Sequence, residues 1–313
     1  MTGKRRGRIC LAAAGLILLA GLAYGQGAPS PAKKRTLAAE TQDEMIIVRI
    51  DDATFTCYRY GAGQKYPYFY PVNGPLSGLS LTTESSLPYP HHRSLWFGWD
   101  RVNGGDYWQE GNERGQIVSR GAKVMINGPD IVRIEDECDW RQPGGSPVVT
   151  DEREIAITAP SDSVRIIDFA IKVTALTDIV FEQTNHSLFS ARMAPALSVA
   201  SGGVLINAEG KSGEKETAGK SSPWMDYSGT RFGLTEGLAI FDAPGNLWHP
   251  SRWFTRDYGF FSPTNMNWIE DKGLWLKAGK SFVFRYRVIV HAGNAGPADL
   301  AGEFARWAKA VSQ

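Results

Sequence analysis

The stretch that decides the fold is VRIIDFAIKVTAL, at residues 164–176. Ile167, Phe169, Ile171 and Val173 share one face of an extended chain, because successive side chains of a strand point to opposite sides. The residues between them include an aspartate, a lysine and a threonine. A strand with one apolar and one polar face is typical of an antiparallel sheet that packs on one side only.

The same alternation returns near the end of the chain in SFVFRYRVIVH, at residues 281–291. Short alternating segments elsewhere lie between clusters of Gly, Pro, Asn and Asp, which predicts strands joined by turns. Helical periodicity is clear only in PADLAGEFARWAKAVS, where one stripe holds Leu300, Phe304, Trp307 and Val311. We therefore predict an all-β fold: a large antiparallel β-sandwich with a C-terminal helix packed on a sheet.

The N-terminal segment has the pattern of an export signal. Residues 1–25 join a basic start to an apolar run that ends at Ala23-Tyr24-Gly25. A retained membrane anchor is the competing interpretation, but the apolar run is shorter than the roughly 20 residues that span a bilayer. We expect a signal peptide over 1–25, a flexible linker over 26–43 and a single β-sandwich domain over 44–313. The mature protein would then be periplasmic or secreted.

Charge and hydropathy limit the partners. Cleavage after residue 25 removes four cations and no anions, which takes the formal net charge from +1 to −3. Nucleic-acid binding requires a basic surface, so no nucleic acid is expected as a partner. No later segment is long and apolar enough to cross a membrane, so no membrane is expected as a partner after cleavage. The remaining candidate partner is a small-molecule or glycan ligand.

Two cysteines, Cys57 and Cys138, lie in the mature chain. An oxidising compartment would allow a disulfide between them, whereas two buried free thiols are the alternative. The segment 207–224 lacks apolar periodicity and is expected as a long surface loop.

One short segment, PHHRSLWFGWDRVNGGDYWQEG at residues 90–111, gathers unusual chemistry. Asn103-Gly104 predicts a tight hairpin, since both central residues of a type I′ turn have positive φ. A two-residue loop there places Trp99 opposite Trp108, although a register that uses both glycines is an alternative. Because Pro90 precedes the histidine pair, we expect His91 and His92 in a loop, where both can face one site.

The histidines are the candidate acid–base groups or metal ligands. His186, His249 and His291 join the pair, each beside arginines, aromatic residues or small residues. Imidazole suits several transition metals, so a divalent metal is a candidate cofactor, with His91, His92 and His249 as its ligands. The alternative is that each histidine is held separately by backbone hydrogen bonds.

Arginines and tryptophans near these motifs suggest a ligand rich in hydroxyl groups or carrying a carboxylate. Guanidinium groups bind carboxylates through paired hydrogen bonds, and flat aromatic rings offer surfaces for stacking. Intramolecular ion pairs and core packing are the alternatives. Carboxylates in aromatic or histidine surroundings are further candidates, because burial raises their pKa.

Five blocks together resemble a bacterial family labelled "methane oxygenase PmoA": YPYFYPVNGP, the 90–111 segment, PWMDYSG, LAIFDAPGNLWHPSRWFTRDYGFFSP and FRYRVIVHAG. The resemblance covers most of residues 45–292. It implies an exported protein of glycan-degrading bacteria, and its sheet-rich pattern is similar to the galactose-mutarotase-like supersandwich. Methane oxidation does not carry over, because that activity belongs to a subunit with several membrane-spanning helices.

Three hypotheses follow. The first is a carbohydrate-active enzyme of hydrolase, lyase or epimerase type; the second is a non-catalytic sugar-binding protein; the third is a metal-dependent oxidoreductase, as the label implies. The candidate catalytic residues are His91, His92, His186, His249 and Glu110. The candidate substrate-binding residues are Arg93, Trp96, Trp108, Asp226, Arg256, Asp257 and His291. All three hypotheses require these distant side chains to share one hollow.

Overall fold

The structure is a computed structural model that describes residue 1 and residues 35–109, 111–294 and 297–312. The chain separates into two compact units, residues 1–32 and 33–313, and the second holds every element named below. The expected signal peptide lies outside the described residues, apart from Met1. No helix in the described part of the chain has both the length and the apolar character needed to span a membrane.

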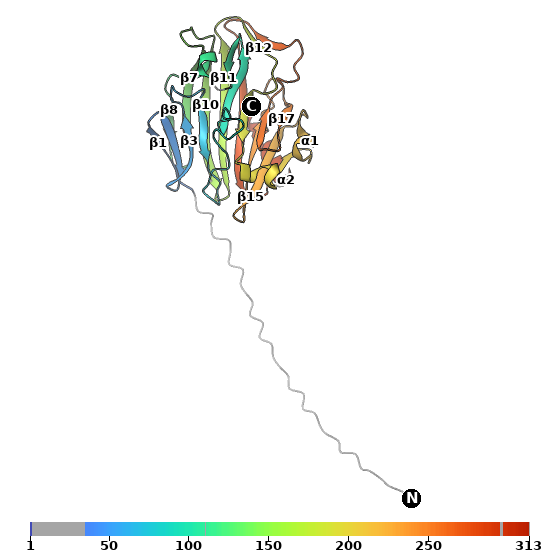
Figure 1. The fold of residues 1–313 in the computed structure, drawn as a ribbon. Helices are drawn as coiled ribbons and strands as arrows, with labels where there is room; N and C mark the ends of the chain where they lie inside the picture. The colour runs from blue at the N-terminus through green and yellow to red at the C-terminus, as the bar shows by residue number, and fades with distance from the viewer. Residues whose placement is uncertain (2–34, 110, 295–296, 313) are drawn as a thin grey trace. The chain divides into compact units, whose positions relative to one another are not determined.

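The second unit contains two antiparallel sheets (Figure 1). The first sheet has the order β1-β2-β3-β4-β5-β13-β18-β17, with β6 and β12 paired to β5 and β19 paired to β12. Its strands are β1 (Leu37–Gln42), β2 (Met45–Ile50), β3 (Ala53–Arg59), β4 (Tyr68–Val72), β5 (Leu95–Val102), β6 (Gly105–Tyr107), β12 (Ile179–Glu182), β13 (Leu188–Arg192), β17 (Trp253–Thr255), β18 (Phe260–Pro263) and β19 (Gly273–Leu276).

The second sheet has the order β14-β15-β16-β20-β11-β10-β9-β7, and β8 pairs with β9. Its strands are β7 (Gln116–Ser119), β8 (Lys123–Asn127), β9 (Val132–Arg141), β10 (Val149–Ser161), β11 (Val164–Ala175), β14 (Val204–Asn207), β15 (Trp224–Arg231), β16 (Leu234–Asp242) and β20 (Ser281–Ala292). The α-helices are α1 (Gly213–Thr217) and α2 (Pro297–Val311), and short 3-10 turns lie at Asn112–Arg114, Pro195–Leu197 and Val199–Ser201.

The two segments with the clearest alternation form neighbouring strands, as predicted. β11 pairs antiparallel with β20, and Phe169 lies opposite Tyr286. Their apolar faces point toward the first sheet, where the Phe169 ring lies 4.9 Å from the ring of Phe189 and 6.3 Å from that of Phe97. The core therefore lies between the sheets, and the expected all-β sandwich is confirmed.

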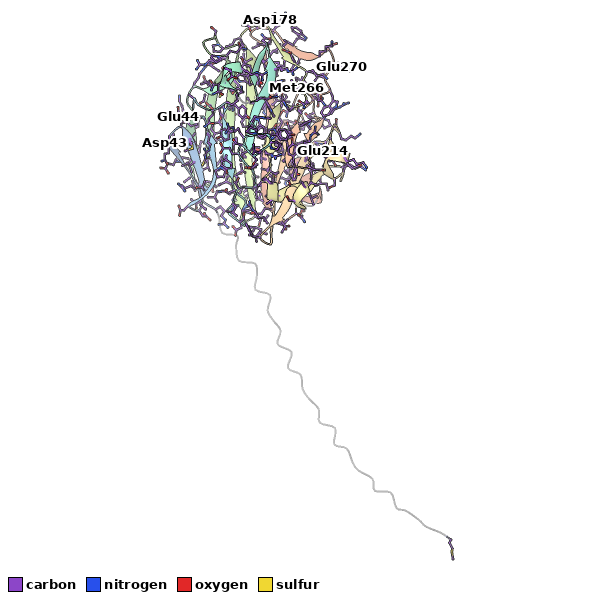
Figure 2. The ribbon with its side chains drawn as sticks, viewed as in Figure 1. Asp43, Glu44, Asp178, Glu214, Met266 and Glu270 are labelled. Carbon is purple, nitrogen blue, oxygen red and sulfur yellow. The ribbon has the colours of Figure 1, made fainter. Side chains whose placement is uncertain are left out.

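The first strand begins earlier than expected. Residues 37–42 form β1, although the sequence predicted a flexible linker up to residue 43. β1 pairs with β2 across a tight turn at Asp43 and Glu44, whose φ angles of 46° and 57° are positive (Figure 2). The short strand is ordered because β2 supplies its hydrogen-bonding edge.

Helix α2 covers the outer face of the second sheet, as predicted from its apolar stripe. Leu300 and Trp307 are buried against Trp224, Phe241 and neighbouring residues of that sheet. The expected loop over 207–224 is wrong in part, because it contains helix α1.

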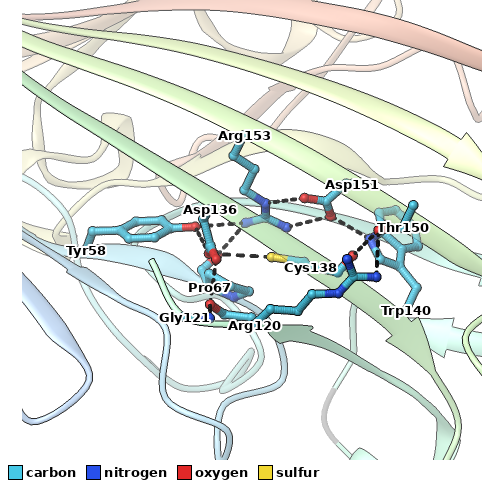
Figure 3. Close-up of polar contacts among 11 residues, drawn as sticks. Tyr58, Pro67, Arg120, Gly121, Asp136, Cys138, Trp140, Thr150, Asp151 and Arg153 are labelled. Carbon is cyan, nitrogen blue, oxygen red and sulfur yellow. Dashed lines mark hydrogen bonds and ion pairs between the residues drawn. The ribbon is translucent and has the colours of Figure 1, made fainter. Parts of the chain in front are cut away.

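A buried polar network connects the two sheets (Figure 3). Tyr58 of β3 donates a hydrogen bond to Asp136 of β9 at 2.8 Å. Arg153 pairs with Asp151 at 2.7 Å, and Trp140 donates to the same carboxylate at 2.6 Å. The two cysteines are free and buried, so the expected alternative of a disulfide is not realised.

Candidate functional site

The tight hairpin at Asn103-Gly104 is confirmed, with φ angles of 47° and 77°. Its register differs from the expected one. Val102 pairs with Gly105, but an irregularity at Asp100 then places Trp99 opposite Tyr107 instead of Trp108. A bulge leaves one residue without an opposite partner and turns the strand locally. Trp99 therefore points into the core, while Trp108 lies across Gly98.

The outer face of the first sheet carries the candidate site. Phe97, Phe189 and Phe261 point inward to the core. Because side chains alternate along a strand, Trp96, Arg192 and Phe260 point outward. These three residues come from β5, β13 and β18, which are consecutive strands of the sheet.

A loop folds over this outward face. Glu84 and Arg93 form an isolated bridge at its base, and Ser85 N donates to the His92 carbonyl at 3.0 Å. Arg93 also donates to Ser85 Oγ at 2.7 Å. The loop thus holds Tyr89, His91 and His92 over the sheet, and Arg93 fixes the loop.

The rings from the loop and the sheet pack into one group. His92 lies 4.5 Å from His91, 5.2 Å from Tyr89, 5.5 Å from Trp96 and 4.8 Å from Phe260 between ring centroids. We call the following residues the outer-face cluster: Tyr89, His91, His92, Trp96, Trp108, His186, Arg192, Tyr258 and Phe260.

His186 enters the cluster from the segment before β13. Its ring stacks on Trp108 with centroids 5.1 Å apart and planes 7° apart. Its Nδ1 lies 3.5 Å from Asp100 Oδ2. Asp106, next to this pair, accepts hydrogen bonds from the backbone of Trp108 and Gln109 at 2.9 Å and thereby fixes the end of the hairpin.

Burial controls the charges in the cluster. Desolvation, with smaller effects from His91 and Arg192, lowers the pKa of His92 to about 2. Desolvation also lowers the pKa of His186 to about 4. Both imidazoles are therefore neutral near pH 7. Desolvation and the Asp106 charge raise the pKa of Asp100 to about 6.

Several buried polar atoms in the cluster have no hydrogen-bond partner in the described part of the chain. They are His92 Nδ1, His186 Nδ1, Trp96 Nε1, Trp108 Nε1, and Arg192 Nε and Nη1. An unsatisfied buried donor or acceptor costs about 1–3 kcal/mol. Buried polar groups are normally hydrogen-bonded, so these atoms require partners that the described chain does not supply.

The cluster is closed in this structure. His92 is 4% exposed and Trp108 is fully buried. Four surface hollows of about 230–330 Å³ lie elsewhere among the described residues, and no cluster residue lines any of them. Tyr89 and Tyr258 are half-buried and lie 5.0 Å apart at the rim. A ligand would therefore have to displace the loop that carries Tyr89.

The expectation that all five histidines share one hollow is wrong. His291 lies on the outer face of the second sheet, where its Nε2 is 2.8 Å from Asp226. His249 lies at the end of β16, 3.2 Å from Asp242 and stacked on Phe304 of α2. The sandwich core separates these residues from the cluster.

The proposed metal ligands are not brought together, because His249 lies in the loop after β16, against Asp242 of the second sheet, away from His91 and His92. No group of three or more His, Cys, Asp or Glu residues that could hold a metal ion is found within the described residues. The two adjacent imidazoles therefore lack a third ligand there.

The remaining predicted site residues have local roles. Arg256 donates to Glu214 of α1 at 3.1 Å, and Asp257 accepts from the Glu214 backbone at 2.8 Å. Arg256 also covers Phe254, which packs on Phe260 at the border of the cluster. Glu110 lies outside the described residues.

The sequence pattern does not identify Tyr89, Asp100 and Tyr258 as members or neighbours of the site, and it indicates Arg192 only as one of several arginines near the histidine motifs that could bind an acidic ligand. Arg192 stands near His186 in the sequence, but nothing in its local pattern shows that it points outward. Tyr258 directly follows Arg256 and Asp257, which the sequence predicts as substrate-binding residues. Alternation along β13 places Arg192 on the outward face once the structure shows that Phe189 points inward.

The sequence matches a family model described as "Family of unknown function (DUF6807)" over residues 46–305. No curated protein matches it. The label "methane oxygenase PmoA" stays a prediction, since the matching description does not contain it.

Among solved structures, the chain is similar to a galactose 1-epimerase from Lactobacillus acidophilus NCFM, with 11% identity, a TM-score of 0.38, and coverage of 83% of this chain and 99% of that one. It is also similar to a GalM/aldose epimerase homologue from C. elegans, with 9% identity, a TM-score of 0.34, and coverage of 84% and 100%. TM-scores below 0.5 support no conclusion about chemistry. The family match spans most of the chain, and the protein therefore belongs to the DUF6807 family.

Proposed function

We propose that the protein binds a carbohydrate at the outer-face cluster and acts on it by proton transfer. The observation that carries this proposal is the set of buried, unpartnered polar atoms on His92, Trp96, Trp108 and Arg192, beside the pair of His186 and Asp100. Sugar hydroxyl groups both donate and accept hydrogen bonds, so one ring can satisfy N–H donors and neutral imidazoles together. The neighbouring aromatic faces offer the apolar surface that a sugar ring stacks on.

In the closed cluster both imidazoles are weak bases, because burial lowers the pKa of His92 to about 2 and that of His186 to about 4. Displacement of the covering loop by a ligand hydrates both rings and returns their pKa toward the usual 6.5, where general acid–base catalysis is most effective. A neutral imidazole accepts a proton from a hydroxyl or C–H group when the ligand lies within hydrogen-bond reach. His92 and His186 approach from the loop and from the segment before β13, with Asp100 beside His186. We assign proton transfer to these two histidines, and ligand positioning to Trp96 and Trp108. Hydrolase, lyase and epimerase chemistry all use such a step.

A binding and turnover assay on a panel of mono- and oligosaccharides tests the proposal. Trp108→Ala should weaken binding by at least about tenfold, because it removes a stacking surface and a donor. His92→Ala should abolish turnover while the dissociation constant changes only a few-fold. Trp275→Ala is the matched control, because Trp275 is 70% exposed on β19 and lies outside the cluster.

Two results would contradict this function. Failure of every saccharide to bind would exclude the carbohydrate site. Binding without turnover, unaffected by His92→Ala, would leave a non-catalytic sugar-binding protein and remove the proton-transfer step.

We also propose that the protein is exported, from the basic and apolar pattern of residues 1–25. N-terminal sequencing of the protein from a periplasmic or extracellular fraction tests this. A chain that starts near residue 26 is expected, whereas an intact N-terminus in the cytoplasmic fraction contradicts export.

A further inference from the structure

Arg192 is a buried cation that the fold holds in place. It ends β13; its backbone N–H donates to Ser94 at 2.8 Å, and its carbonyl accepts from Thr83 at 2.9 Å. The residue is 3% exposed, and its guanidinium carbon lies 4.2 Å from the centre of the Tyr258 ring. Its Nε and Nη1 have no hydrogen-bond partner among the described residues.

No carboxylate of the described chain pairs with Arg192. The groups that affect its charge, apart from burial, are the tyrosines Tyr258, Tyr227 and Tyr89. Burial lowers the pKa of Arg192, and a buried charge without a partner costs several kcal/mol. The cation–π contact with Tyr258 offsets only part of such a cost.

Two other arginines of the described chain have carboxylate partners. Arg153 pairs with Asp151 at 2.7 Å, and Arg287 pairs with Asp168 at the same distance. Arg231 also leaves two nitrogens unpartnered, but it is only half-buried and donates to the Ser80 carbonyl at 3.1 Å. Arg192 combines deep burial, missing partners and a place in the outer-face cluster.

We propose that Arg192 binds the carboxylate of an acidic sugar, so that the substrate class is uronic acids or their glycans. This inference rests on the carbohydrate function proposed above and deepens it. A carboxylate supplies the negative charge and the acceptor oxygens that the guanidinium lacks. Arg192 is a single fixed cation beside neutral imidazoles, so it matches a ligand with one negative charge. The adjacent Trp96 and His92 place the sugar ring next to the ligand carboxylate.

The first test needs no variant. D-galacturonate and D-glucuronate are compared with the methyl ester of D-galacturonate and with D-galactose in binding titrations on the whole protein. The acids should bind at least about tenfold more tightly than the ester, because only the acids carry the charge. Acetate should bind far more weakly than either acid.

The second test changes the protein. Arg192→Met should remove the preference for acid over ester while the ester still binds. It should also leave thermal stability without ligand unchanged or raise it, because it removes an unpaired buried charge. Arg59→Met is the matched control: Arg59 also packs on a tyrosine of the first sheet, but it donates to the Tyr70 carbonyl at 3.1 Å.

The outcomes separate the two proposals. Equal binding of acid and ester overturns the role of Arg192 and leaves the carbohydrate function standing. Absence of binding by every sugar overturns both. Acetate binding as tightly as galacturonate overturns the sugar acid as the ligand. If Arg192→Met does not fold, the comparison of acid and ester on the unchanged protein still decides.

Discussion

At the residue scale, the same side chain behaves in opposite ways on the two sheets. His92 is buried among neutral rings beside Arg192, and its pKa falls to about 2. Burial also disfavours the protonated form of His291, but the Asp226 carboxylate at 2.8 Å and the Gly293 carbonyl outweigh this effect and raise its pKa. Charge partners, not burial alone, decide whether a buried imidazole is charged.

His291 should make stability depend on pH. Its folded pKa is raised above the usual value of 6.5. The stability that protonated His291 contributes to the folded protein is therefore complete below about pH 6.5 and is lost as the pH rises through the folded pKa. Denaturant unfolding at pH 6 and pH 9 should show a fall in the free energy of unfolding that His291→Gln abolishes. Identical falls in both proteins would contradict the assignment.

At the element scale, the β5–β6 hairpin shows how a local signal fixes a turn but not a register. Asn103-Gly104 predicts the turn, because glycine adopts the φ of 77° without strain. The bulge at Asp100 is not visible in the sequence, since it depends on Trp108 crossing over Gly98. A Cβ at Gly98 would lie 2.9 Å from the Tyr107 carbonyl and 3.3 Å from the Trp108 ring.

Gly98→Ala should therefore destabilise the protein by about 1–3 kcal/mol, because the Tyr107 backbone must move. It should also shift the tryptophan fluorescence, since Trp108 loses its stacking on His186. Gly104→Ala is the control: no atom lies within 4 Å of its Cβ, so only about 1 kcal/mol of backbone strain is expected. Equal fluorescence changes in both variants would show that the close approach at Gly98 does not position Trp108.

At the scale of the whole molecule, the sandwich separates two outer faces with different roles. Helix α2 covers one with apolar side chains. The loop from Ser85 to His92 covers the other with rings and unpartnered polar groups. The buried network around Arg153 fixes one sheet against the other and so fixes the faces.

Asp151→Asn should cost about 3–5 kcal/mol of unfolding free energy, because it leaves the fully buried Arg153 without its charge partner. Glu152→Gln should cost no more than about 1 kcal/mol, because its pair with Lys172 is half exposed. Chemical denaturation of the two neighbouring variants measures the difference. Similar costs would show that the buried Arg153 does not depend on the Asp151 carboxylate.

The pattern of residues determined the strands, the tight hairpin and the C-terminal helix, because side-chain alternation and turn chemistry act over a few neighbouring positions. It also placed His91 and His92 in a loop beside Trp96. Alternation did not reveal that Asp151 and Arg153 point inward, because a charged pair replaces the apolar signal there.

The tertiary structure alone decided which distant residues meet. It brought His186 and Arg192 to His92, and it placed His291 on the other sheet and His249 in a loop beside that sheet. Sequence spacing carries no information on this, because strand order and the inward face of each strand are set by packing between sheets. The site is therefore a property of the folded sandwich, whereas the fold class is already a property of the chain.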